Sequence, residues 1–137
     1  MSIFVDASAL VAIILKETEV DRLAERLENH DERLTSAVAL WETMAAVRRA
    51  RDTSVELAWA EVERFRLALD LRLLPIGAEE AEQAVIAYAR YGKGHHPARL
   101  NMGDCFAYAC AHGQDAELLY KGDDFALTDL ADPERLQ

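Results

Sequence analysis

Four acidic positions in this chain stand in apolar surroundings, where a carboxylate that only faces solvent is not expected. Asp6 follows Ile-Phe-Val, and Glu42 follows Ala-Leu-Trp. Asp104 opens the apolar run Cys-Phe-Ala-Tyr-Ala-Cys-Ala, and Asp123 and Asp124 follow Leu-Leu-Tyr-Lys-Gly. These acids lie early, centrally and late in the chain. Such spacing is typical of a site that the fold assembles from distant segments.

Burial of these carboxylates would require a counter-charge, because removing an unpaired ion from water costs several kcal/mol. The basic residues nearest in sequence to Asp6 and Asp104 are Lys16 and Arg99, so local pairing does not supply it. Mg²⁺ and Mn²⁺ are hard cations that take oxygen ligands. Without a cation, clustered carboxylates repel, and at least one pKa rises. The pattern therefore predicts a divalent-cation site.

Each acid taken alone also has a plain structural interpretation. Asp6 could cap a helix, and Glu42 could lie half-exposed beside Arg49. Asp104, one residue after a glycine, could be a first-turn helix acid favoured by the helix dipole, and Asp123 and Asp124 could form an ordinary turn. The combination, rather than any single residue, favours the cation site.

The elements that must position these acids are short apolar strands alternating with helices. The pattern predicts strands at 3–5, 33–35, 73–76 and 117–120, and helices at 8–15, 20–29, 37–51, 55–71, 79–91 and 102–112. This alternation is typical of a parallel sheet with helices on its faces, where ligands bind beyond the carboxyl ends of the strands. Asp6 and the turn at 122–124 both directly follow a predicted strand.

Composition indicates one domain over residues 1–137, with 51% hydrophobic and 29% charged residues. Two cysteines, both on one predicted helix, favour a reducing cytoplasm over a disulfide scaffold. Neither a signal peptide nor a membrane helix is expected. The net charge of −10 argues at first against nucleic acid, yet residues 83–103 contain no acid and carry Arg90, Lys93, His95, His96 and Arg99.

At these residues the chain resembles a PIN domain and, within that superfamily, a VapC-type toxin of a toxin–antitoxin pair. The resemblance covers almost the whole chain. It rests on Phe-Val-Asp-Ala-Ser-Ala-Leu at 4–10, on 36–42, on Tyr-Gly-Lys-Gly at 91–94, on Leu-Asn-Met-Gly-Asp-Cys-Phe at 100–106 and on Tyr-Lys-Gly-Asp-Asp-Phe at 120–125. The last two segments are the most specific.

The resemblance implies a three-layer α/β/α fold with a parallel sheet of four or five strands. It also implies RNA cleavage that depends on Mg²⁺ or Mn²⁺, inhibition by a cognate antitoxin, a homodimer, and a hetero-oligomer of toxin with antitoxin. Asp6, Glu42 and Asp104 match the three main acids of the family. Asp124 is preferred as the fourth, although the turn also aligns with Asp123 in that role.

The residue roles follow from this resemblance. Asp6, Asp104 and Asp124 are expected to hold the cation, and Glu42 to orient a water or help hold a second ion. Ser8 matches a small hydroxyl residue that orients the first acid, and Asn101 matches a polar position one turn before Asp104 that contacts metal-bound water or substrate. Both are therefore expected among the substrate-binding residues. The basic segment around Lys93 and Arg99 is the first candidate for binding RNA, and Arg48, Arg49 and Arg51 are the second.

Two other functional classes remain open from the residues alone. One is a Mg²⁺-binding phosphotransfer domain of the receiver or haloacid-phosphatase type, which fits less well because Ser8 stands where a phosphatase has a second Asp. The other is a non-catalytic PIN-fold binding module, against which retention of all the acids argues. Trp41 and Trp59 are expected in the core or at an interface, and His95 and His96 in a solvated loop.

Overall fold

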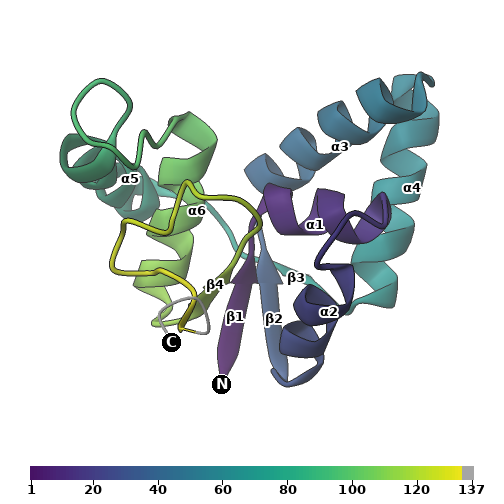
Figure 1. Ribbon diagram of the computed structural model, residues 1–137, viewed down its shortest axis with the longest axis horizontal. Coiled ribbons are helices and arrows are strands. Elements are labelled where there is room, and N and C mark those ends of the chain that lie inside the picture. The colour runs from purple at the N-terminus through teal and green to yellow at the C-terminus, as the bar shows by residue number, and fades with distance from the viewer. Residues whose placement is uncertain (134–137) are drawn as a thin grey trace.

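Strand β1 (Ser2–Val5) lies inside a four-stranded sheet, between β2 (Glu32–Thr35) and β4 (Glu117–Leu119), and β3 (Arg72–Leu73) forms the edge beside β2. All three strand pairings are parallel, with Phe4 opposite Leu34 and Leu118. This arrangement is that of a computed structural model that describes residues 1–133 (Figure 1).

Within residues 1–133, six helices cover the two faces of the sheet, which gives three layers (Figure 1). Alternation along β1 sends Phe4 to one face and Ile3 and Val5 to the other, which produces two separate cores. The core that contains Phe4 includes α5 (Ala78–Tyr91) and α6 (Met102–Gly113). The other core draws on four helices: α1 (Ala7–Ile14), α2 (Val20–Glu28), α3 (Ala37–Arg51) and α4 (Val55–Ala68). The predicted three-layer α/β/α fold is confirmed, with four strands.

The strand order places a topological switch point between β1 and β4, because the chain leaves β1 toward β2 on one side and returns as β4 on the other. The backbone N–H of Asp6 donates to the Leu119 carbonyl at 3.0 Å, which holds the ends of these two strands together. The carboxyl ends of β1 and β4 thus meet at one place, and each is followed directly by acidic residues.

The third strand is shorter than the sequence predicted. Leu74 still donates its N–H to the Thr35 carbonyl at 2.9 Å, but Pro75 has no N–H with which to continue the ladder. The prediction for the tryptophans was wrong as regards the core, because the exposed fractions of Trp41 and Trp59 are 65% and 42%. Among the described residues, no helix is long and apolar enough to cross a membrane.

Candidate active site

Asp6 lies between β1 and α1, and its carboxylate is fixed from the α1 side by Ser8. The N–H and the hydroxyl of Ser8 both donate to Asp6 Oδ2, at 3.0 and 2.6 Å. Ser8 Oγ in turn accepts the backbone N–H of Lys121, which follows β4, at 3.0 Å. Asp6 therefore does cap α1, as one interpretation held, and Ser8 ties that cap to the segment after β4.

Asp104 occupies the first turn of α6 and is held there by a reciprocal cap with Asn101. Asn101 Oδ1 accepts the backbone N–H of Asp104 at 2.9 Å, and Asp104 Oδ2 accepts the N–H of Asn101 at 3.1 Å. Only 9% of Asp104 is exposed. The oxygen of the Asn101 side chain is thus used to orient the helix end that carries Asp104, which positions the acid.

Glu42 reaches the site from α3, where its half-buried carboxylate lies against the backbone of Gly103. A Cβ atom at position 103 would lie 2.1 Å from Glu42 Oε2, so only glycine leaves room for the carboxylate as it stands. Sequence reasoning missed this requirement. Its signal is a glycine directly before an acid in the first turn of an apolar helix, which has no local need for a glycine.

The segment after β4 brings the fourth acid. Gly122 has a φ of +100°, which an L side chain rarely adopts, and turns the chain so that Asp123 and Asp124 follow at the mouth of the site. The charge of Asp124 acts on both Asp6 and Asp104. This coupling favours Asp124 over Asp123 as the fourth acid, and the assignment stays a prediction.

Burial and neighbouring carboxylates shift the pKa values of Asp6, Glu42 and Asp104. Burial raises the pKa of Asp6, against the opposing hydrogen bonds from Ser8, and the charge of Asp124 raises it further. Burial, followed by the charges of Asp6 and Asp104, raises the pKa of Glu42 to about 7. Burial also raises the pKa of Asp104 to about 7, with Asp6 and Asp124 adding to the effect. Asp6 and Asp104 are therefore each coupled electrostatically to the other three acids.

No cation of the described part of the chain neutralises this cluster: none of the ion pairs within residues 1–133 includes Asp6, Glu42, Asp104 or Asp124. Within the same residues, no three His, Cys, Asp or Glu side chains stand close enough together to hold a metal ion as they lie. Coulombic repulsion works against closer approach of uncompensated carboxylates. Four hard oxygen donors without a counter-charge nevertheless suit Mg²⁺ in their chemistry.

Two cavities are lined by acids of this set, while Asp6, which is 4% exposed, lines neither of them. The larger, of about 700 Å³, is lined by Asn101, Asp104 and Asp124 together with the exposed Lys93 and Arg99. The smaller, of about 370 Å³, is lined by Ser8 and Glu42 among others. We refer to the two cavities together as the carboxylate cleft.

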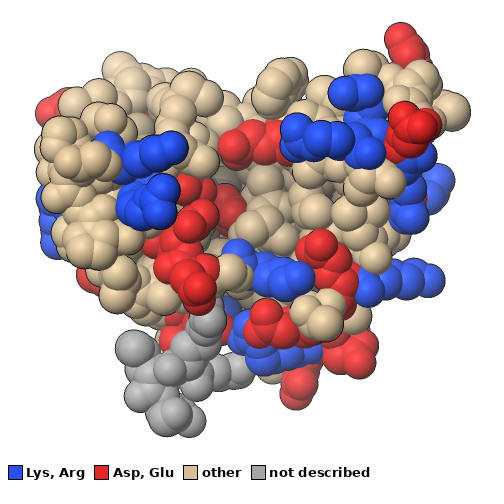
Figure 2. Space-filling model, turned by 45° about the horizontal axis from the view of Figure 1, so that its top comes forward, with Lys and Arg blue, Asp and Glu red and all other residues tan. Residues whose placement is uncertain are grey.

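The basic side of the cleft belongs to the loop between α5 and α6. The N–H of Lys93 donates to the Leu100 carbonyl at 2.9 Å, and the N–H of Leu100 donates to the Tyr91 carbonyl at 3.0 Å, so these bonds close the loop on itself. Arg99, at a φ of +57°, is held in a left-handed conformation within it. Figure 2 shows an acidic band on this face with basic groups on either side of it.

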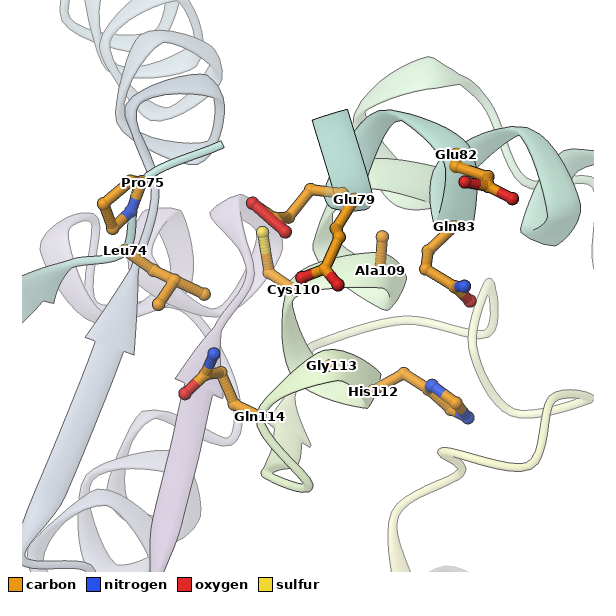
Figure 3. Close-up of a pocket in the computed structure, with 11 residues that line it drawn as sticks. Leu74, Pro75, Glu79, Glu82, Gln83, Ala109, Cys110, His112, Gly113 and Gln114 are labelled. Carbon is orange, nitrogen blue, oxygen red and sulfur yellow. The ribbon is translucent and has the colours of Figure 1, made fainter. Parts of the chain in front are cut away.

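A second pocket, of about 690 Å³, lies between α5 and the C-terminal part of α6 (Figure 3). Glu79 and Glu82 line it from α5, and Cys110 and His112 line it from α6. None of the four acids of the carboxylate cleft borders it. We call it the α5–α6 pocket.

A family model for the PIN domain matches residues 3–130 of this chain. The chain belongs to the PIN-domain family. It is similar to a VapC ribonuclease of Rhizobium meliloti (strain 1021), with 40% identity over 93% of this chain and 98% of the relative. It is likewise similar to ribonuclease VapC30 of Mycobacterium tuberculosis, with 39% identity over 93% and 95% of the two chains. These likenesses place it among the VapC ribonucleases of that family.

A solved PIN-domain structure has the same fold. Mycobacterium tuberculosis VapC20, described as a toxin that cleaves the sarcin–ricin loop, superposes with a TM-score of 0.69 at 22% identity, over 96% of this chain and 99% of that chain. At this identity the likeness concerns the fold. The resemblance that the sequence motifs indicated is thus confirmed for the family, while the residue roles rest on the geometry described above.

Proposed function

We propose that this VapC-family chain is the toxin of a toxin–antitoxin pair and cleaves RNA internally with the help of Mg²⁺ or Mn²⁺. The observation that carries the proposal is the set of four electrostatically coupled carboxylates, three of them with pKa values raised by burial. Two of the four, Asp104 and Asp124, line the same cavity as Lys93 and Arg99. The names of the similar VapC ribonucleases support the same reaction.

Asp6, Asp104 and Asp124 are the residues proposed to hold the cation. Ser8 keeps the Asp6 carboxylate in place, and Asn101 does the same for Asp104. A bound divalent cation would supply positive charge for a phosphate group and lower the pKa of a water. The chain's own contribution is to keep these oxygen donors at one end of the sheet, from which their side chains would have to draw closer together on binding.

Glu42 is the residue proposed to accept a proton. A group whose pKa lies near the working pH serves best as a general base, and burial with the charges of Asp6 and Asp104 brings the pKa of Glu42 to about 7. The carboxylate lies against Gly103, at a place that a Cβ atom at this position would occupy. Glu42 would therefore orient the attacking water and take up its proton.

Lys93 and Arg99 are proposed to bind the phosphates of RNA beside the acids. Both are exposed, and both line the same cavity as Asp104 and Asp124. Cations at the rim of an acidic centre compensate for the net charge of −10, which would otherwise repel RNA. Local rather than total charge thus decides whether the substrate can approach.

The antitoxin is proposed to place a basic tail in the carboxylate cleft and to pack an apolar helix on α4. Helix α4 of this chain buries only Ala58 and Val62, while its Leu57 and Leu67 are 65% and 67% exposed. By contrast, α2 buries Leu23 and Leu27 in the core and offers less apolar surface. A homodimer, and a larger assembly of toxin with antitoxin, belong to the same proposal through the family.

The direct test is cleavage of synthetic RNA by the purified chain with Mg²⁺, with EDTA, and with the Asp6→Asn variant. We expect cleavage by the wild type in Mg²⁺ only, and a loss of about 10²–10³-fold in the variant, because the central oxygen donor loses its charge. Expression in cells should arrest growth, and a co-expressed antitoxin should relieve the arrest. Cleavage by Asp6→Asn at the wild-type rate would overturn the assignment, as would phosphorylation of Asp6 without RNA cleavage.

A further inference from the structure

The exposed face of α3 begins beside Glu42 and combines one large aromatic side chain with two arginines. Trp41 directly precedes Glu42 and is 65% exposed, although tryptophan is one of the residues that gains most from burial. Arg48 lies seven residues, or two helical turns, further along nearly the same face, and Arg49 lies beside it. Both arginines are exposed.

These arginines have no structural partner in the described part of the chain. Within residues 1–133, neither Arg48 nor Arg49 takes part in an ion pair or a side-chain hydrogen bond, whereas Arg51 pairs with Glu61 at 3.2 Å. Position in the last turn of α3 accounts for a modest preference for basic residues. It does not account for an exposed tryptophan at the opposite end of the same face.

The exposed face of α3 carries fewer large apolar side chains than the exposed face of α4. Four large apolar side chains of α4 are exposed, namely Val55, Leu57, Trp59 and Leu67, which forms the kind of extended patch that a partner helix covers. On α3, Trp41 is the one large apolar side chain among the described residues that is strongly exposed. A single aromatic residue followed by free cations is instead typical of single-stranded nucleic-acid binding, where a base stacks and phosphates meet basic groups.

The contact between Glu42 and Gly103 connects this face to the carboxylate cleft. Each partner of this contact follows an exposed apolar residue. Trp41 precedes Glu42, and Met102, which is 66% exposed, precedes Gly103. An RNA strand bound along α3 would therefore reach the acids at its Trp41 end.

We propose that the exposed face of α3 binds single-stranded RNA. An unpaired base stacks on Trp41, and phosphates further along the strand bind Arg48 and Arg49. The proposal rests on the function proposed above and deepens it by naming the substrate as unpaired RNA and Trp41 as the residue that places it. Positioning by Trp41 would select which phosphate meets the carboxylates. RNA would then span the cleft from α3 to Lys93 and Arg99.

The test is a fluorescence titration of Trp41 with short unstructured RNA. The chain has two tryptophans, so Trp59→Phe leaves Trp41 as the single reporter, and Asp6→Asn prevents cleavage. We expect RNA to quench this fluorescence and an abasic chain with the same number of phosphates to leave it unchanged. Trp41→Ala should weaken RNA binding by about 5–150-fold, Trp41→Phe should retain most of the affinity, and Trp59→Ala should match the wild type.

Salt dependence separates the arginines from the tryptophan. Replacing Arg48 and Arg49 with alanine should reduce the slope of log K against log salt by about 1.4, while Trp41→Ala should leave that slope unchanged. Equal RNA affinity of Trp41→Ala and wild type would overturn the proposal. So would a change of oligomeric mass in Trp41→Ala without a loss of RNA affinity, since the face would then join copies of the chain.

The cleavage assay distinguishes failure of this proposal from failure of the proposed function. If wild type does not cleave RNA in Mg²⁺, the proposed function is wrong, whatever the fluorescence gives. If wild type cleaves and Trp41→Ala cleaves with the same kcat/KM, the carboxylate site stands and the stacking role of Trp41 is wrong.

Discussion

The carboxylate cleft and the α5–α6 pocket both contain several acidic side chains, and their main cavities have almost equal volumes of about 700 and 690 Å³. They differ in what surrounds the acids. Asp6 and Asp104 are 4% and 9% exposed, while Glu79 and Glu82 in the α5–α6 pocket are exposed to solvent (Figure 3). Neither the size of a pocket nor the presence of acids therefore distinguishes a candidate metal centre.

The origins of the acids explain this difference. Glu79, Glu80 and Glu82 all come from the first turns of one helix, where negative charge is favourable, and Glu80 accepts the N–H of Gly77 at 2.9 Å as a cap. The acids of the carboxylate cleft come instead from four segments distant in sequence. Helix formation explains the acids of the α5–α6 pocket, whereas convergence of acids from distant segments, two of them buried, has no such local explanation.

The largest difference between the carboxylate cleft and the α5–α6 pocket is expected when a glycine of each region is replaced by alanine. Gly103→Ala would place its Cβ 2.1 Å from Glu42 Oε2, which forces the carboxylate to move. Because that carboxylate is the end of a flexible side chain, the free energy of unfolding should change little, while kcat/KM for RNA should fall by about 10²-fold.

Gly113→Ala is the matched control in the α5–α6 pocket. A Cβ at Gly113 meets nothing within 4 Å, so this variant should cleave RNA like the wild type and be slightly more stable, by up to about 1 kcal/mol. Cleavage rates and urea unfolding measure both effects. Wild-type activity in Gly103→Ala would show that the position of Glu42 does not matter to the reaction.

A smaller effect is expected in the stability of the metal-free protein. The pKa values of Glu42 and Asp104 are raised to about 7, so between about pH 4 and pH 7 the folded protein holds more protons than the unfolded chain. The free energy of unfolding should therefore fall as pH rises through this interval. We expect a loss on the order of 1 kcal/mol, because solvent screens the half-buried Glu42.

Urea unfolding in EDTA at about pH 5 and about pH 8 measures this loss. Asp104→Asn should reduce the difference between the two pH values, and Glu79→Gln with Glu82→Gln should leave it unchanged. An equal effect of the two sets of substitutions would mean that burial does not distinguish the two groups of acids.

Much of this architecture could be predicted from the sequence, because its signals are local. Ile-Phe-Val followed by Asp6 predicts a buried strand with an acid at its carboxyl end, and the structure places Asp6 there. The helix predicted at 37–51 is observed at those residues, and it begins directly after Ser36, whose Oγ accepts the N–H of Ala39 at 3.1 Å. In a parallel sheet, knowing that residues follow the strands is enough to place them at the same edge.

The exposed faces of the helices could not be predicted in this way. Along α3 the residues from 37 to 41 are all apolar, so periodicity does not identify which face is buried. Trp41 was expected in the core or at an interface and is 65% exposed, while the structure buries Ala39, Leu40, Thr43 and Val47. The contact of Gly103 with Glu42 depends on how two helices meet, which no local pattern encodes.

A calorimetric titration of Mg²⁺ into the purified chain at about pH 8 tests most directly whether the carboxylate cleft is a metal centre. We predict saturable binding by the wild type, binding weakened at least about 10-fold in Asp104→Asn, and unchanged binding when Glu79 and Glu82 are both replaced by glutamine. Absence of binding by the wild type, or loss of binding only when Glu79 and Glu82 are replaced, would contradict the claim that the carboxylate cleft is the metal centre.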